Sequence, residues 1–175
     1  MNVWYSLSDI PGNEASVVTI GNFDGMHNGH KKVVSTCIER AHKLGVDAVA
    51  ITFFPHPIQV HKPEVGLQLI SPLRDRLDAM AAAGLDATLV ARYDASVYSL
   101  EPEEFVYEYL VERCGAREVV VGEDFRFGCG NVGTIDTLRE LGSRYGFGVI
   151  TVTDIEAPEG RRWSSSWVRE LLADG

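Results

Sequence analysis

The chain has 175 residues, of which 45% are hydrophobic and 23% charged, so it can bury a full core without disulfides or structural metal ions. Lys and Arg number 16 against 25 Asp and Glu, and the resulting net charge of −9 argues against a broad basic surface for DNA or RNA. The chain has no apolar stretch of about 18 residues and no basic start followed by an apolar run, so neither a membrane span nor a signal peptide is predicted.

Apolar runs alternate along the chain with segments of helical periodicity. Five runs predict strands, over residues 16–20, 47–54, 87–91, 117–121 and 147–153. The segments between and after them predict helices, over about 29–44, 71–83, 101–114, 134–145 and 164–172, with Ser71 as the N-cap of the second. Residues 55–69 are expected to form a loop.

This alternation predicts an α/β fold with a five-stranded, mostly parallel sheet and helices on both faces. No linker or repeat divides the chain, so a single domain over 1–175 is expected. In such sheets ligands bind beyond the carboxyl ends of the strands, near the point where the strand order reverses. The unusual residues of this chain do follow predicted strands.

The first predicted strand leads into a glycine-rich turn and a helix start. Residues 21–30 read Gly-Asn-Phe-Asp-Gly-Met-His-Asn-Gly-His. Free N–H groups at a helix N-terminus bind anions, and glycines let a ligand approach the backbone. His27 and His30 can project from the same side of the first turn and donate hydrogen bonds to a transferring phosphoryl group. Two histidines without a third nearby ligand do not make a zinc site.

The pattern Gly-x-Phe-Asp-Gly-x-His-x-Gly-His resembles the signature of HxGH nucleotidyltransferases. The surrounding residues resemble the N-terminal module of prokaryotic FAD synthetases, which are bifunctional riboflavin kinase/FMN adenylyltransferases. The resemblance spans roughly residues 16–172 and implies a Rossmann-like nucleotidyltransferase fold. It implies catalytic roles for His27, His30 and Arg169. The ATP-binding residues expected from the same motifs are Gly21, Asn22, Phe23, Asp24, Gly25, Gly29, Ser164, Ser165 and Ser166.

Two further segments, after the second and fourth predicted strands, supply aromatic side chains. They read Thr-Phe-Phe-Pro-His-Pro over 52–57 and Gly-Glu-Asp-Phe-Arg-Phe-Gly over 122–128, and both are similar to flavin-binding segments of the family. The expected flavin-binding residues are Phe54, Pro55, His56, Pro57, Asp124, Phe125, Phe127 and Gly128. The chain departs from the family at Phe54, where an acidic residue is common, and at Asp124, where Asn is common.

The last segment, residues 163–169, reads Trp-Ser-Ser-Ser-Trp-Val-Arg. Hydroxyl groups at a helix start can cap the helix and bind phosphate oxygens, and a guanidinium one turn later can reach a phosphate. The family equivalent is Ile-Ser-Ser-Thr-x-x-Arg, which contacts ATP. Trp163 replaces the Ile and Ser166 the Thr, while Trp167 has no explanation from the sequence.

The reaction that the resemblance implies is transfer of AMP from ATP to the phosphate of FMN, which gives FAD and pyrophosphate. Mg²⁺ is expected as cofactor, with Asp24 of the motif as the most plausible acidic ligand and its direct coordination left open. Three alternatives stay open: another phosphate acceptor, a modified flavin, and a flavin- or nucleotide-binding module without catalysis.

The expected partners are therefore ATP and FMN, without nucleic acid or membrane. The oligomeric state is left open. Three cysteines at no metal-ligand spacing favour a reducing, cytoplasmic setting. Bifunctional members carry a riboflavin kinase module after this region, and the sequence ends before such a module, so no riboflavin kinase activity is expected.

Overall fold

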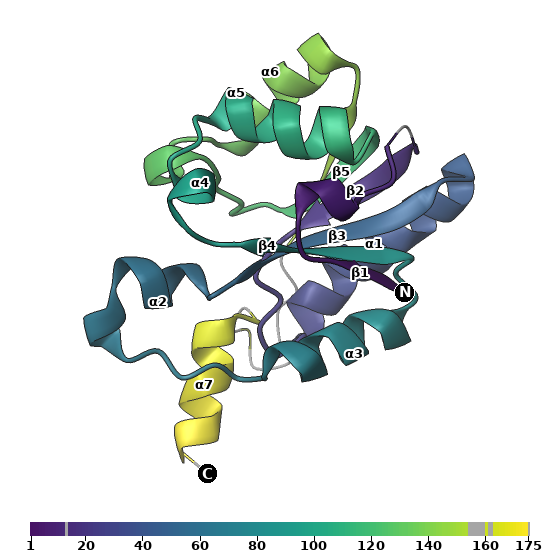
Figure 1. The fold of residues 1–175 in the computed structure, drawn as a ribbon. Coiled ribbons are helices and arrows are strands. Elements are labelled where there is room, and N and C mark those ends of the chain that lie inside the picture. The colour runs from purple at the N-terminus through teal and green to yellow at the C-terminus, as the bar shows by residue number, and fades with distance from the viewer. Residues whose placement is uncertain (13, 154–159, 161–162, 175) are drawn as a thin grey trace.

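The computed structural model describes residues 1–12, 14–153, 160 and 163–174 and forms one twisted sheet between two layers of helices (Figure 1). Six strands pair in parallel in the order β1-β4-β3-β2-β5-β6. The strands are β1 Asn2–Trp4, β2 Ser16–Ile20, β3 Asp47–Phe54, β4 Ala87–Arg92, β5 Ala116–Gly122 and β6 Gly148–Val152. The predicted α/β class and parallel sheet are confirmed.

The helices fall between the strands as predicted, and the loops contain additional short ones. The α-helices are α1 Asn28–Leu44, α2 Pro57–His61, α3 Leu73–Ala83, α4 Ala95–Tyr98, α5 Pro102–Phe105, α6 Ile135–Tyr145 and α7 Ser165–Asp174. A π-helix, η3, covers Val106–Arg113, and short 3₁₀ turns are η1 Leu7–Asp9, η2 Pro63–Val65 and η4 Cys129–Asn131. Among the described residues, no helix is long and apolar enough to cross a membrane.

Each face of the sheet carries its own hydrophobic core, because successive side chains of a strand point to opposite faces. In β2, Val17 packs with α1, while Val18 packs with η3 and α6. Helices α1 and α3 lie on one side of the sheet, and α5, η3 and α6 lie on the other (Figure 1). A strand buried on both faces reads as a continuous apolar run, which is why β2 was recognised in the sequence.

The strand count was wrong by one. Strand β1 comprises only Asn2–Trp4 and pairs with the edge of β4, and three residues are too few to show an alternating pattern. The predicted helix over 101–114 is present but changes to a π-helix after Phe105. The predicted loop over 55–69 contains α2, where the His56 ring caps the helix by accepting a hydrogen bond from the N–H of Ile58.

The predicted N-cap of α3 was wrong by one residue. Pro72 occupies the N-cap position, and Ser71 serves the glycine-rich loop instead. Its hydroxyl accepts a hydrogen bond from the N–H of Gly25, and its own N–H donates to the Asp24 carboxylate at 3.1 Å. The polar residue before the helix therefore connects α3 to the loop that follows β2.

The strand order reverses between β2 and β5. From β2 the chain adds β3 and β4 on one side, and then crosses to add β5 and β6 on the other. The two loops that leave this point begin at Gly21 and after Gly122, where the sequence motifs lie.

Candidate active site

Two cavities open at the carboxyl ends of the strands. The larger has a volume of about 660 Å³, which is within the usual range for small-molecule sites, and the smaller has about 260 Å³. Ile20, Gly21 and Phe125 line both. The two cavities are therefore adjacent at the strand-order reversal, and ligands in them would meet beside the end of β2.

The smaller cavity contains the paired histidines. His27 is the N-cap of α1, and its Nδ1 accepts a hydrogen bond from the N–H of His30 at 3.4 Å. The neutral ring therefore carries its proton on Nε2, where it can donate to a ligand. The two rings stack with their centroids 3.7 Å apart, so the expectation that both lie on one side of the turn is confirmed.

His30 is a neutral imidazole in this environment. Burial, together with the nearby His27, lowers its pKa from 6.5 to about 3. The ring of Phe23, which is fully buried, meets it edge-on at 5.4 Å. His30 Nδ1 is buried and has no hydrogen-bond partner within the described part of the chain. At neutral pH His30 can therefore offer a ligand a neutral N–H but no positive charge.

The expected ATP-binding residues divide into two groups. Those that line the smaller cavity are Gly21, Phe23, Gly29, Ser164 and Ser165, together with His27 and His30. Asn22 lines the larger cavity instead, and Asp24, Gly25 and Ser166 line neither. The Ser164 hydroxyl accepts a hydrogen bond from the N–H of Trp167 at 3.2 Å, so it caps α7 as expected.

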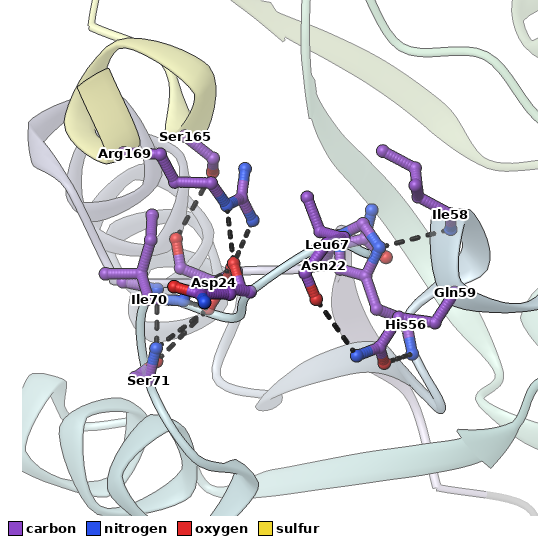
Figure 2. A network of polar contacts seen from close by, with 12 residues as sticks. Asn22, Asp24, His56, Ile58, Gln59, Leu67, Ile70, Ser71, Ser165 and Arg169 are labelled. Carbon is purple, nitrogen blue, oxygen red and sulfur yellow. Dashed lines mark hydrogen bonds and ion pairs between the residues drawn. The ribbon is translucent and has the colours of Figure 1, made fainter. Parts of the chain in front are cut away.

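Asp24 organises a network instead of facing a cavity (Figure 2). Its fully buried carboxylate accepts hydrogen bonds from the N–H groups of Ile70 and Ser71, each at 3.1 Å. It also accepts one from the guanidinium of Arg169, and its backbone carbonyl accepts one from the Ser165 hydroxyl. Asp24 thus ties the glycine-rich loop to α7 and to the segment before α3.

This network decides the position of Arg169. Its Nε donates to the carbonyl of Gln68 at 2.9 Å and its Nη2 to Asp24, and the side chain lines neither cavity. The expected contact between Arg169 and a phosphate stays a prediction. In this structure the side chain fastens α7 to the loop.

A carboxylate with these partners does not fit a magnesium ligand. Asp24 has no exposed oxygen to offer, and the described residues contain no group of three His, Cys, Asp or Glu side chains that could hold a metal ion. Any magnesium ion would need most of its ligands from the phosphates and from water, as is common for this ion.

The larger cavity has mainly aromatic and apolar walls. Of the expected flavin-binding residues, it is lined by His56, Pro57, Phe125, Phe127 and Gly128. The rings of Phe125 and Phe127 stack with centroids 5.5 Å apart. Phe54 and Pro55 do not line it, because alternation along β3 directs Phe53 to the cavity while Phe54 is 43% exposed. Asp124 lines the smaller cavity instead.

Further residues that line the larger cavity lie outside the set of expected flavin-binding residues. His61, Tyr93 and Tyr98 form an aromatic cluster at the larger cavity, in which His61 Nε2 and the Tyr93 hydroxyl are 2.9 Å apart. Their only sequence signal was position, since the tyrosines follow the strand over 87–91. They add polar edges to a cavity whose other walls are apolar.

Arg76 is a fully buried cation below the cavities. It extends from α3, and its Nη1 donates to the carbonyl of Asn22 at 2.8 Å and to the Thr52 hydroxyl at 3.2 Å. Burial lowers its pKa, and the nearby Asp24 opposes this effect. It holds together the ends of β2 and β3. The sequence signal was a charged residue on the apolar side of a predicted helix, between Leu73 and Met80.

The chain is similar to known proteins over most of its length. A family model described as FAD synthetase matches residues 9–167. A bifunctional riboflavin kinase/FMN adenylyltransferase of Escherichia coli strain K12 is 35% identical over 170 residues, which are 97% of this chain and 54% of that protein. A putative enzyme of the same description from Geobacillus thermodenitrificans is 36% identical, over 95% of this chain and 86% of the relative.

A solved structure also shares the fold over almost the whole chain. The protein, titled a macrolide-efflux protein from Streptococcus pneumoniae, superposes with a TM-score of 0.85 at 26% identity. The match covers 99% of this chain and 57% of that one. The chain thus spans about half the length of the Escherichia coli relative and of this structural neighbour.

Proposed function

Because the chain belongs to the FAD synthetase family, we propose that it transfers AMP from ATP to the phosphate of FMN, giving FAD and pyrophosphate. The observation that carries the proposal is the pair of adjacent cavities. The larger has aromatic walls suited to a flavin ring, and the smaller has two histidines at a helix N-terminus suited to a phosphate chain.

The reaction needs positioning and charge stabilisation rather than a protein nucleophile. A phosphate oxygen of FMN attacks the α-phosphorus of ATP, the bond from that phosphorus to the bridging oxygen breaks, and pyrophosphate leaves. The shared wall at Gly21 and Phe125 is where the FMN phosphate would meet the α-phosphate. The free N–H groups of the first turn of α1 would hold the phosphates.

The two histidines would stabilise the charge that develops on the transferring phosphoryl group. His27 would donate from Nε2, since its Nδ1 is occupied as the helix cap. His30, held neutral by burial, would donate without bringing a full positive charge into the site. Ser164 and Ser165 line the same cavity and would contact phosphate oxygens.

Mg²⁺ remains part of the proposal as a companion of the triphosphate. Chelation with EDTA should abolish FAD formation and leave the melting temperature unchanged, because no metal cage is seen among the described residues. We place the activity in the cytoplasm, where the three free cysteines would stay reduced.

The test is FAD formation from ATP, FMN and Mg²⁺, measured by chromatography. His27→Asn is the sharpest variant, because Asn is a good N-cap but lacks the Nε2 donor. We expect it to fold normally and to lose about 10²–10³ in kcat, as when one preorganised donor is removed. The control is His42→Asn, an exposed position on the same helix, which should keep full activity. Equal activities in both variants would remove His27 from the reaction.

A further inference from the structure

Trp163 lines the smaller cavity, and none of the contacts above explains an aromatic residue at this position. It is half-buried and precedes Ser164 and Ser165, which line the same cavity. Its ring lies 4.7 Å from that of Trp167, centroid to centroid, at 47°, and Trp167 is buried. Trp163 therefore packs on a ring that is fixed in the core of the structure.

Residue 163 also lies close to the start of α1. Its carbonyl oxygen is 3.6 Å from the position that a Cβ on Gly29 would take. A nucleotide with its phosphates at the first turn of α1 would therefore lie beside residue 163 in the same cavity.

The other aromatic residues of this wall have different partners. Phe23 is fully buried against His30, and Phe125 lies at the boundary with the larger cavity, which it also lines. Among the described phenylalanine and tryptophan residues that line the smaller cavity, Trp163 is therefore the one left to stack on a flat ring of a ligand.

We propose that Trp163 is a specificity-determining residue whose indole stacks on the purine base of the nucleotide donor. The inference rests on the proposed function, because it takes the smaller cavity as the ATP site. Base–aromatic stacking uses the π-face of the base and needs no hydrogen-bond donor from the side chain. The chain has tryptophan where the family pattern has isoleucine, so this contact would be a feature of this chain rather than of the pattern.

The test compares binding of ATP with binding of inorganic tripolyphosphate, which has the phosphates but no base. Trp163→Ala should weaken ATP binding about tenfold or more, in line with the loss of one stacked base. Its affinity for tripolyphosphate should stay unchanged. Trp163→Phe should keep ATP affinity close to that of the original chain, because phenylalanine restores a stacking face. In turnover, Trp163→Ala should raise KM for ATP and leave kcat and KM for FMN unchanged.

Fluorescence gives a second readout that a merely structural role would not change. The chain has three tryptophans, so a protein with Trp4→Phe and Trp167→Phe retains Trp163 alone. ATP should quench its emission and tripolyphosphate should not. The control is a protein that retains Trp4 alone, in strand β1, whose emission should respond to neither ligand.

Each outcome decides between the two claims. Unchanged ATP affinity in Trp163→Ala would overturn the stacking role, and an equal loss of tripolyphosphate binding would also overturn it, since it would show displacement of the serines beside residue 163. These measurements need no FMN. ATP binding through Trp163 without FAD formation would refute the proposed function alone, and FAD formation with unchanged ATP affinity in Trp163→Ala would refute the inference alone.

Discussion

At the residue scale, the candidate site contains a histidine that stays neutral. His30 has a folded-state pKa of about 3 because burial disfavours the imidazolium, and a second ring stacks on it at 3.7 Å. A neutral donor keeps its proton through the physiological pH range. The activity of the chain should therefore show no loss of rate that belongs to deprotonation of His30 near pH 6.5.

The same shift makes stability depend on pH. The folded-state pKa lies below the ordinary value of 6.5, so the unfolded chain takes up a proton first as the pH falls. The contribution of neutral His30 to the free energy of unfolding is complete above pH 6.5. It is lost progressively between pH 6.5 and about 3. At pH 5 the expected loss is about 2 kcal/mol, from 1.36 kcal/mol per pH unit.

Urea denaturation at pH 7 and pH 5 measures this loss. His30→Asn should remove most of it, while the exposed His42→Asn should not change it. His56 will keep a smaller dependence of the same sign in both variants, because its burial also lowers its pKa. A pH dependence in His30→Asn equal to that of the original chain would contradict the neutral, buried state of His30.

The positions of some site residues could be predicted from the sequence, and those of others could not. The motif residues His27 and His30 could be placed together because three residues on a helix fix their relation. Which of Phe53 and Phe54 lines the larger cavity depends on which face of β3 meets that cavity. A strand buried on both faces is apolar throughout, so its sequence does not show which residues point to which face. The partner of Asp24 could not be foreseen, because Arg169 is 145 positions away in the sequence.

At the scale of elements, an ion pair between Asp24 and Arg169 links α7 to the glycine-rich loop. The Asp24 side chain is 0% exposed and that of Arg169 is 21% exposed, so the pair is far less screened than a surface pair. Asp24→Asn and Arg169→Gln should each lower the free energy of unfolding, by up to about 3 kcal/mol. The double variant should lose less than the sum, with a coupling of about 1–3 kcal/mol.

Urea denaturation of the original chain, the two single variants and the double variant gives the coupling free energy between Asp24 and Arg169. The matched control is the exposed pair Arg139–Asp136 on α6, with side chains 52% and 92% exposed, for which about 0.3–0.5 kcal/mol is expected. A coupling for Asp24 and Arg169 no larger than that of the control would show that the pair does not fasten α7.

The first turn of α1 leaves little room for a side chain at Gly29. A Cβ there would lie 3.1 Å from Cε1 and Nδ1 of His27, so the ring would have to shift by a few tenths of an ångström. Gly29→Ala should therefore lower FAD formation at least tenfold, while the free energy of unfolding stays the same or rises by up to about 1 kcal/mol, since Ala is the better helix residue.

The control for this change is Gly148→Ala in β6, where a Cβ meets only ordinary contacts at 3.5 Å or more. It should keep full activity. Full activity in Gly29→Ala would contradict the close packing of His27 on the helix start.

The elements that could be predicted from the sequence are those long enough to show a clear apolar pattern, and the shorter or irregular ones could not be predicted. Strand β2 and helices α1 and α6 had clear runs and caps. Strand β1 was too short to show a pattern, and the π-helix after Phe105 has the same apolar spacing as an α-helix over one turn. The boundary of α3 moved because Ser71 is used by another loop.

At the scale of the whole molecule, the strand order brings the motifs together. Loops that leave β2 and β5 are a hundred residues apart in sequence, yet they line the same cavity because the two strands are neighbours. The parallel arrangement could be predicted, and it placed every motif at one edge of the sheet. Which motif faces which cavity required the structure.

The most direct test of the account is a single assay with FMN, ATP and Mg²⁺. The account predicts FAD and pyrophosphate in equal amounts, with loss of both products in the double variant His27→Ala and His30→Ala. Folded protein that binds both ATP and FMN but forms no FAD would contradict it.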